Sequence, residues 1–153
     1  MKRFLAMLFV LSVVILSLNS CKDEVKVDLD QIPVETEIQR FDRAFYQVDT
    51  NAVYAALPKL QEEYTPFFSA ETEPIFWRNQ RLDPLQNELF AKTEQVFGDM
   101  ENESAQLNAI LKRFYYYFGL TDTLELYTYI SRLDFNYPVV YAKPYLFVAL
   151  DLY

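Results

Sequence analysis

The sequence predicts an α+β fold in which helices come first and a small β-sheet follows. Two observations lead to this prediction. Between about residues 53 and 118, apolar residues recur with the period of a helix, and after about residue 123 the period changes to that of a strand. With 153 residues, of which 52% are hydrophobic and 17% aromatic, the chain provides for about one domain with a packed core.

The first twenty residues are typical of a signal peptide. Lys2 and Arg3 give a short positive region, and residues 4–18 are apolar except for two serines. This apolar run is shorter than the roughly 20 residues that a permanent membrane-spanning helix needs. We therefore expect residues 1–20 to be removed on export.

The single cysteine of the chain stands directly after this run, in Leu18-Asn19-Ser20-Cys21. The segment resembles a bacterial lipoprotein signal, with Leu three residues before the cysteine and a small residue one before it; Asn19 departs from the strictest form of the pattern. The resemblance implies a diacylglycerol on the Cys21 sulfur, cleavage before Cys21 and acylation of the new amine. Two or three acyl chains anchor a protein stably, since each buried methylene contributes about 0.8 kcal/mol. The alternative is a buried free cysteine.

Residues 21–33 are expected to form a lipidated, flexible tether, because they show no helical period and end at Pro33. Within this segment, Lys22-Asp23-Glu24 has two interpretations. It resembles the export tag that sends some Bacteroidota lipoproteins to the outer cell surface, and it is equally typical of a solvated charged spacer. Cleavage would remove two basic residues and no acidic ones, leaving 12 basic against 22 acidic residues and a net charge of −10. We therefore expect the lipid, rather than the polypeptide, to contact the membrane.

Short elements are expected after the tether. Alternating apolar and polar residues over 34–40 predict a strand, and 41–45 is expected to form a helical turn. Asp49-Thr50 offers an N-cap for a helix that ends at an aromatic turn over 64–68. Pro58 lies within this helix and predicts a kink or a restart there.

Three segments are expected in the middle of the chain, at residues 69–82, 83–98 and 103–119. The first is assigned to a loop or short helix that packs Phe76 and Trp77 inward. The second begins at Asp83-Pro84, an N-cap followed by proline at the first helical position. The second and third each end at a glycine. The residues of these two helices expected to face inward are Leu85, Leu89, Val96, Phe97, Leu107, Ile110, Leu111, Phe114, Tyr115 and Phe118.

Three strands are expected at residues 123–131, 139–141 and 145–152. The last of them is apolar on both faces apart from Asp151. A strand of this kind is usually covered on both sides, and no later segment is at hand to cover it. We therefore expect residues 34–153 to form an α+β domain that is truncated at its C-terminal end.

The composition excludes several kinds of site. The chain has no His and one Cys, so it cannot form by itself a Ser-His-Asp or Cys-His catalytic site, an HExxH zinc helix or a disulfide framework. Its formal net charge of −8 argues against nucleic-acid binding, because phosphate recognition needs clustered Lys and Arg. Its two glycines, Gly98 and Gly119, are too far apart for a phosphate-binding loop.

The order of several segments resembles the gliding-motility lipoprotein GldB family of Bacteroidota. The matching segments are residues 18–22, 38–42 with Phe45, 64–68, 127–131, 137–141 and 147–153. The resemblance covers nearly the whole chain, and because family members are longer it implies an N-terminal part. It further implies a membrane-anchored envelope protein needed for gliding over surfaces. The family is also distantly similar to zincin-like peptidases, in which a sheet precedes a metal-binding helix.

Arg40, Phe41 and Asp42 give the sharpest local match to this family. The functional interpretation is a recognition point or a polar latch near a cleft. The alternative is a strand-to-helix junction in which Asp42 caps the helix and Arg40 pairs with a carboxylate. The sheet region also contains three acidic residues, Asp122, Asp134 and Asp151. Their carboxylates can come together only if the sheet aligns them.

We expect an envelope lipoprotein in the outer membrane, on either leaflet, with no catalytic residue, metal or cofactor in this chain. Its expected partners are the membrane, through lipid on Cys21, and envelope proteins of the gliding or secretion apparatus; no nucleic acid is expected. Two alternatives remain. One is the first part of a zincin-like hydrolase whose metal site lies beyond Tyr153, and the other is a surface lipoprotein that binds a glycan or a nutrient.

Overall fold

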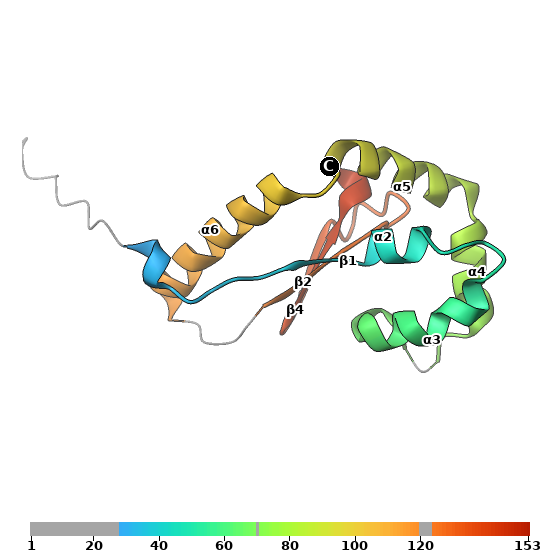
Figure 1. The fold of residues 1–153 in the computed structure, drawn as a ribbon, viewed down its shortest axis with the longest axis horizontal. Helices are drawn as coiled ribbons and strands as arrows, with labels where there is room; N and C mark the ends of the chain where they lie inside the picture. The colour runs from blue at the N-terminus through green and yellow to red at the C-terminus, as the bar shows by residue number, and fades with distance from the viewer. Residues whose placement is uncertain (1–27, 70, 120–123) are drawn as a thin grey trace, which may run out of the picture.

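The structure is a computed structural model that describes residues 28–69, 71–119 and 124–153. Its elements, in chain order, are η1 (Leu29–Gln31), β1 (Ile38–Arg40), α2 (Phe41–Tyr46), α3 (Val53–Glu63), η2 (Thr65–Phe67), α4 (Pro74–Leu82), α5 (Pro84–Phe97), α6 (Glu101–Phe118), β2 (Glu125–Tyr129), β3 (Val139–Ala142), β4 (Tyr145–Ala149) and η3 (Leu150–Leu152). The expected signal peptide and Cys21 lie outside the described residues. The α+β fold is confirmed, with one short strand, β1, ahead of the helices and the other strands after them (Figure 1).

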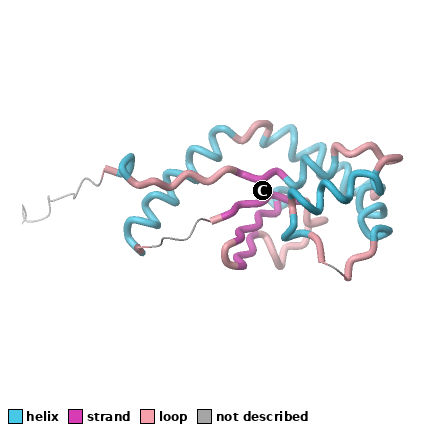
Figure 2. Tube along the Cα trace, turned by 60° about the horizontal axis from the view of Figure 1, so that its bottom comes forward, coloured by secondary structure: helices cyan, strands magenta, loops and turns pink. Residues whose placement is uncertain are grey.

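The four strands form one mixed sheet in the order β1-β2-β4-β3. β1, β2 and β4 are parallel, with Gln39 opposite Tyr127 and Tyr127 opposite Phe147, whereas β3 pairs antiparallel with β4. The connection from β1 to β2 contains helices α2–α6, and Figure 2 shows these helices around the strands. Because β1, β2 and β4 run in the same direction, the residues that follow them meet at one edge of the sheet, hereafter the carboxyl edge.

An aromatic core lies between α2 and the carboxyl edge. Because α2 follows β1 directly, Phe41 and Phe45 are carried into the interior, where they are 5% and 2% exposed. The ring of Phe41 stacks on that of Phe67 with centroids 3.9 Å apart, and it meets Trp77 edge to face at 6.0 Å. The buried members of this core are Phe41, Phe45, Tyr46, Leu57, Leu60, Trp77 and Ile130. The core therefore joins α2, α3 and α4 to the end of β2.

α5 buries only part of the face that its apolar residues predict. Leu89 packs against the aromatic core as expected, but Leu85 and Val96 are 44% and 69% exposed, whereas Gln86 is buried. The expectation for Leu85 and Val96 was wrong because α5 covers polar groups of α2: the buried Gln86 accepts a hydrogen bond from the Tyr46 hydroxyl. The period of the apolar residues does not reveal which surface a helix will meet.

The expectations for α3 and α4 are met only in part. α3 continues through Pro58 as a single helix, so there is no restart, and the kink stays a prediction. This is possible because proline removes only one backbone hydrogen bond, and Pro58 lies on the exposed side. In α4, Trp77 is buried as expected, but Phe76 is 45% exposed. Consecutive helical residues point about 100° apart, so both rings cannot face the same core.

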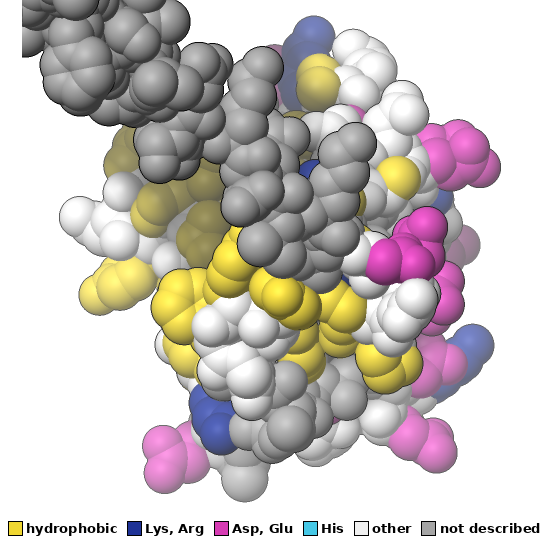
Figure 3. Space-filling model, turned by 90° about the vertical axis from the view of Figure 1, so that its left-hand side faces the viewer, with side chains coloured by type: hydrophobic (Ala, Val, Ile, Leu, Met, Phe, Trp, Pro, Cys, Tyr) yellow, Lys and Arg dark blue, Asp and Glu magenta, His cyan; other side chains and the backbone are white. Residues whose placement is uncertain are grey.

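α6 leaves much of its apolar side uncovered by the described part of the chain. Leu111 is buried, but Ile110 and Phe118, both expected inside, are 60% and 66% exposed. α6 packs against η1, which belongs to the segment expected to be a tether, and Lys112 lies 3.9 Å from Asp30 there. Figure 3 shows hydrophobic side chains gathered around a hollow at this end of the molecule, with acidic side chains along one flank.

Candidate functional site

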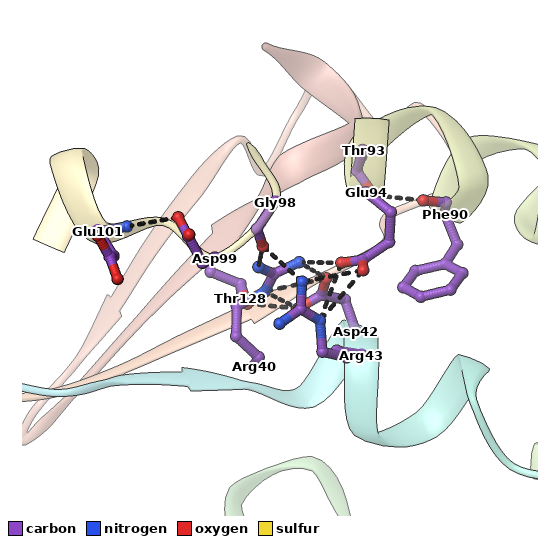
Figure 4. A network of polar contacts seen from close by, with 10 residues as sticks. All are labelled: Arg40, Asp42, Arg43, Phe90, Thr93, Glu94, Gly98, Asp99, Glu101 and Thr128. Atoms are coloured by element: carbon purple, nitrogen blue, oxygen red, sulfur yellow. Dashed lines mark hydrogen bonds and ion pairs between the residues drawn. The ribbon is translucent and has the colours of Figure 1, made fainter. Parts of the chain in front are cut away.

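Arg40 and Asp42 form an ion pair at the junction of β1 and α2. Arg40 ends β1, and Asp42 lies in the first turn of α2 with 0% exposure. Nε and Nη2 of Arg40 donate to the two carboxylate oxygens of Asp42 at 3.0 and 2.6 Å. The hydroxyl of Thr128, on β2, donates to the same carboxylate at 2.5 Å (Figure 4). One buried carboxylate therefore joins three elements of the fold.

α5 closes this cluster with Glu94 and with the backbone carbonyl of Gly98. Glu94 accepts hydrogen bonds from Arg40 at 2.7 Å and from Arg43 at 2.9 Å. The Gly98 carbonyl accepts from the same two guanidinium groups, at 2.9 and 2.5 Å. Two cations and two carboxylates thus balance in charge. We call Arg40, Asp42, Arg43 and Glu94 the arginine latch.

The polar groups of the arginine latch are used within the fold. Burial alone would lower the pKa of Arg40, but the hydrogen bonds and charges of Asp42 and Glu94 outweigh this effect and raise the pKa above its ordinary value. The N-cap of α2 is Arg40, which makes no side-chain capping hydrogen bond, and Asp42 lies in the first turn of the helix. Among the described residues, no buried polar side-chain atom lacks a hydrogen-bond partner. This geometry favours a structural junction over an open recognition point.

A second polar cluster lies at the carboxyl edge, where the turn after β2 meets η3. The expected last strand ends at Ala149, so Asp151 falls in η3 and not in the sheet. Its carboxylate accepts from the backbone N–H of Ser131 at 2.8 Å and of Leu133 at 2.7 Å, and from the Ser131 hydroxyl at 3.0 Å. The Asp134 backbone N–H donates to the Ser131 hydroxyl at 3.1 Å. Ser131 thus links Asp134 to Asp151. The third acidic residue expected in this region, Asp122, lies outside the described residues.

The backbone of this turn is strained. Arg132 and Leu133 have φ values of 64° and 60°, the left-handed region that non-glycine residues rarely enter. Such conformations cost of order 1–3 kcal/mol each and persist where surrounding contacts impose them, often at functional sites. Here the Asp151 carboxylate imposes them. No glycine occurs at these two positions. The sequence therefore gives no local sign of the left-handed backbone, and the turn could not be predicted.

A pocket of about 220 Å³ opens beside the turn, and we call it the aromatic pocket. Its lining includes Phe45, Tyr46, Phe76, Trp77, Ile130 and Arg132. Burial raises the pKa of Tyr46, so its hydroxyl stays protonated and donates to Gln86. At the mouth, Nη2 of Arg132 lies 3.2 Å from a carboxylate oxygen of Asp83, the N-cap of α5. The pocket is therefore apolar inside, with one ion pair at its entrance.

The family model of gliding motility protein GldB matches residues 22–153. The chain belongs to the GldB family. No curated protein and no solved structure matches the chain. Membership associates the chain with lipoproteins of gliding motility and with the cell envelope, and the family's description names no reaction. The distant similarity to zincin-like peptidases stays a prediction.

Neither a metal cluster nor a spanning helix is found within residues 28–69, 71–119 and 124–153. These residues contain no group of three or more His, Cys, Asp or Glu side chains placed to hold a metal ion. No helix among them is both long and apolar enough to cross a bilayer. The lipidation predicted at Cys21 falls before the first described residue and stays a prediction.

Proposed function

We propose that the protein is a lipid-anchored component of the gliding apparatus of a member of the Bacteroidota. It lies in the outer membrane and acts through contacts with other envelope proteins, without catalysis. The observation that carries this proposal is the match to the GldB family over residues 22–153, which begins directly after Cys21.

Exposed apolar side chains support a role in protein contacts. Val139 and Tyr141, both on β3, are 47% and 64% exposed. β3 is also an edge strand, whose free backbone groups can pair with another chain. Exposed apolar surface next to an unpaired strand edge is typical of interaction sites.

The anchor is tested by metabolic labelling with a radioactive fatty acid. We expect label on the wild-type protein and none on the Cys21→Ala variant. Ser20→Ala is the matched control, because it keeps a small residue before the cysteine and should keep the label. Label retained on Cys21→Ala would overturn the anchor.

The motility role is tested by deleting the gene and following the spreading of colonies on agar. We expect the deletion strain not to spread, the wild-type gene to restore spreading, and Cys21→Ala to restore it poorly. Protease added to intact cells then separates the two leaflets, since only a surface-exposed protein is cleaved. A deletion strain that spreads normally would overturn the motility role.

A further inference from the structure

The aromatic pocket lies where residues that follow two parallel strands meet. α2 follows β1 and contributes Phe45 and Tyr46, while the turn after β2 contributes Ile130 and Arg132. Ligand sites of sheets with parallel strands commonly lie at this edge. α4 adds the half-exposed ring of Phe76 at the pocket's side.

The size and lining of the pocket indicate what could occupy it. Its volume of about 220 Å³ is below the roughly 300–1,000 Å³ of most small-molecule sites, and suits one bulky side chain. Its polar groups bond one another: the Tyr46 hydroxyl donates to Gln86, and the Gln86 amide donates to Gln80. These groups leave little hydrogen-bonding capacity for a sugar, so the lining favours an apolar group.

The mouth of the pocket combines an apolar rim with one cation. Among the described residues that line the pocket, Arg132 is the one that carries a charge, and its side chain is 52% exposed. Its partner Asp83 also accepts hydrogen bonds from the backbone N–H groups of Leu85 and Gln86. The Asp83 carboxylate is therefore shared between Arg132 and the start of α5. Because a guanidinium group has five N–H donors, Arg132 can also bind a second carboxylate.

Apolar side chains on both segments joined by this ion pair are exposed. Leu82 and Leu85 flank Asp83 and are 38% and 44% exposed, and Leu133 follows Arg132 and is 40% exposed. Exposed apolar side chains on the segments that carry Arg132 and Asp83 are typical of a surface that contacts a protein partner.

We propose that the aromatic pocket binds a bulky apolar side chain of a partner protein, with a neighbouring carboxylate of that partner paired to Arg132. The inference rests on the proposed function, because it names the chemistry of a contact that the gliding role requires. The turn held by Asp151 fixes the position of Arg132 at the mouth.

Trp77 is the single tryptophan of the chain and lines the pocket, so its fluorescence reports occupancy directly. The full-length lipoprotein, purified in detergent, is titrated with three acetylated, amidated tripeptides: glycine-phenylalanine-glutamate, its glutamine analogue and its alanine-for-phenylalanine analogue. We expect the first to shift Trp77 emission at millimolar concentration. We expect the glutamine analogue to bind several-fold more weakly and the alanine analogue not to bind. No shift with any peptide, equal shifts with all three, or a shift with N-acetylglucosamine alone would overturn the proposal.

Two variants test the residues at the mouth, each with a matched control on α6. Phe76→Ala and Arg132→Gln should weaken binding of the first peptide by about tenfold. Phe118→Ala and Arg113→Gln remove an exposed ring and an exposed cation elsewhere, and should leave binding unchanged. Circular dichroism establishes that each variant is folded. Equal binding by Arg132→Gln and wild type contradicts the assigned ion pair.

Colony spreading separates this proposal from the proposed function. A deletion strain that spreads normally removes the gliding role but leaves the peptide titration as it is. A deletion strain that does not spread, yet is fully restored by both Phe76→Ala and Arg132→Gln, keeps the gliding role and overturns the pocket's part in it. Restoration by the two α6 controls but not by the two mouth variants supports the proposal.

Discussion

The guanidinium group of Arg40 lies 2.6 Å from the fully buried carboxylate of Asp42, although only one residue separates them in the chain. This closeness requires the backbone to turn from strand to helix at Arg40, where φ and ψ are −82° and 71°. The ion pair and the turn support each other. A buried carboxylate is stable only when it is paired and hydrogen-bonded, and the same carboxylate holds α2 against β2 through Thr128.

Asp42→Asn should lower the free energy of unfolding by about 3–5 kcal/mol, because it leaves the Arg40 cation buried without its closest partner. Urea denaturation at neutral pH measures the change. Glu63→Gln is the matched control: its partner Lys59 is 78% exposed at 3.6 Å, so its loss should change stability by less than about 0.5 kcal/mol. Equal effects of the two substitutions would contradict the structural role of the latch.

Arg43→Lys should lower the free energy of unfolding by about 1 kcal/mol, less than Asp42→Asn. The Arg43 side chain is 35% exposed, and its guanidinium donates to both Glu94 carboxylate oxygens and to the Gly98 carbonyl. A lysine ammonium keeps the charge but cannot make this forked contact. Arg113→Lys on α6 serves as the control, and a loss as large as that of Asp42→Asn would show that Arg43 and not Arg40 dominates the latch.

The helix ends could be predicted because their signals are local. Asp83 accepts hydrogen bonds from the N–H groups of Leu85 and Gln86 as an N-cap should, and Gly98 ends the same helix. The buried face could not be predicted in the same way. Gln86 is inside because it meets Tyr46, which lies 40 residues earlier. A contact at that separation leaves no trace in the spacing of apolar residues.

In the candidate site, too, contacts between sequence neighbours could be predicted and contacts between distant residues could not. Arg40 and Asp42 are neighbours in sequence, so their pairing is within reach of sequence reasoning. Glu94 lies more than 50 residues away on α5 and enters the latch only through the packing of α5 on α2. The turn at Arg132 and Leu133 has no glycine and depends on Asp151, which the sequence places in a strand and the structure places in η3.

Leu133→Gly should raise the free energy of unfolding by up to about 1 kcal/mol. Glycine adopts the observed φ of 60° without the steric cost that Leu133 bears, although it loses more backbone entropy on folding. Leu133 is 40% exposed, so little packing is lost. Leu133→Ala is the control, since it removes the same side chain but keeps the strain and should not stabilise. Thermal denaturation of the two variants measures the difference, and a glycine variant less stable than the alanine variant contradicts the strain.

Tyr46→Phe should make the protein less stable at neutral pH and less sensitive to alkali. At neutral pH the buried Gln86 loses its hydrogen-bond donor, which costs about 1–3 kcal/mol. Above pH 10 this difference in stability becomes smaller. Burial raises the pKa of Tyr46 above its ordinary value of 10.0, so the unfolded chain releases this proton at lower pH than the folded chain does.

The stability that Tyr46 contributes is therefore fully present below pH 10 and is lost as the pH rises through the raised pKa of the folded state, by up to about 1.4 kcal/mol per pH unit. Tyr46→Phe lacks this loss, so its stability should approach that of the wild type as the pH rises from 8 to 11. Gln86→Met is the control, because it removes the hydrogen bond but keeps the phenol, and it should fall with pH as the wild type does. Urea denaturation at each pH measures the three slopes. Parallel curves for wild type and Tyr46→Phe would show that the phenol is not shielded from solvent.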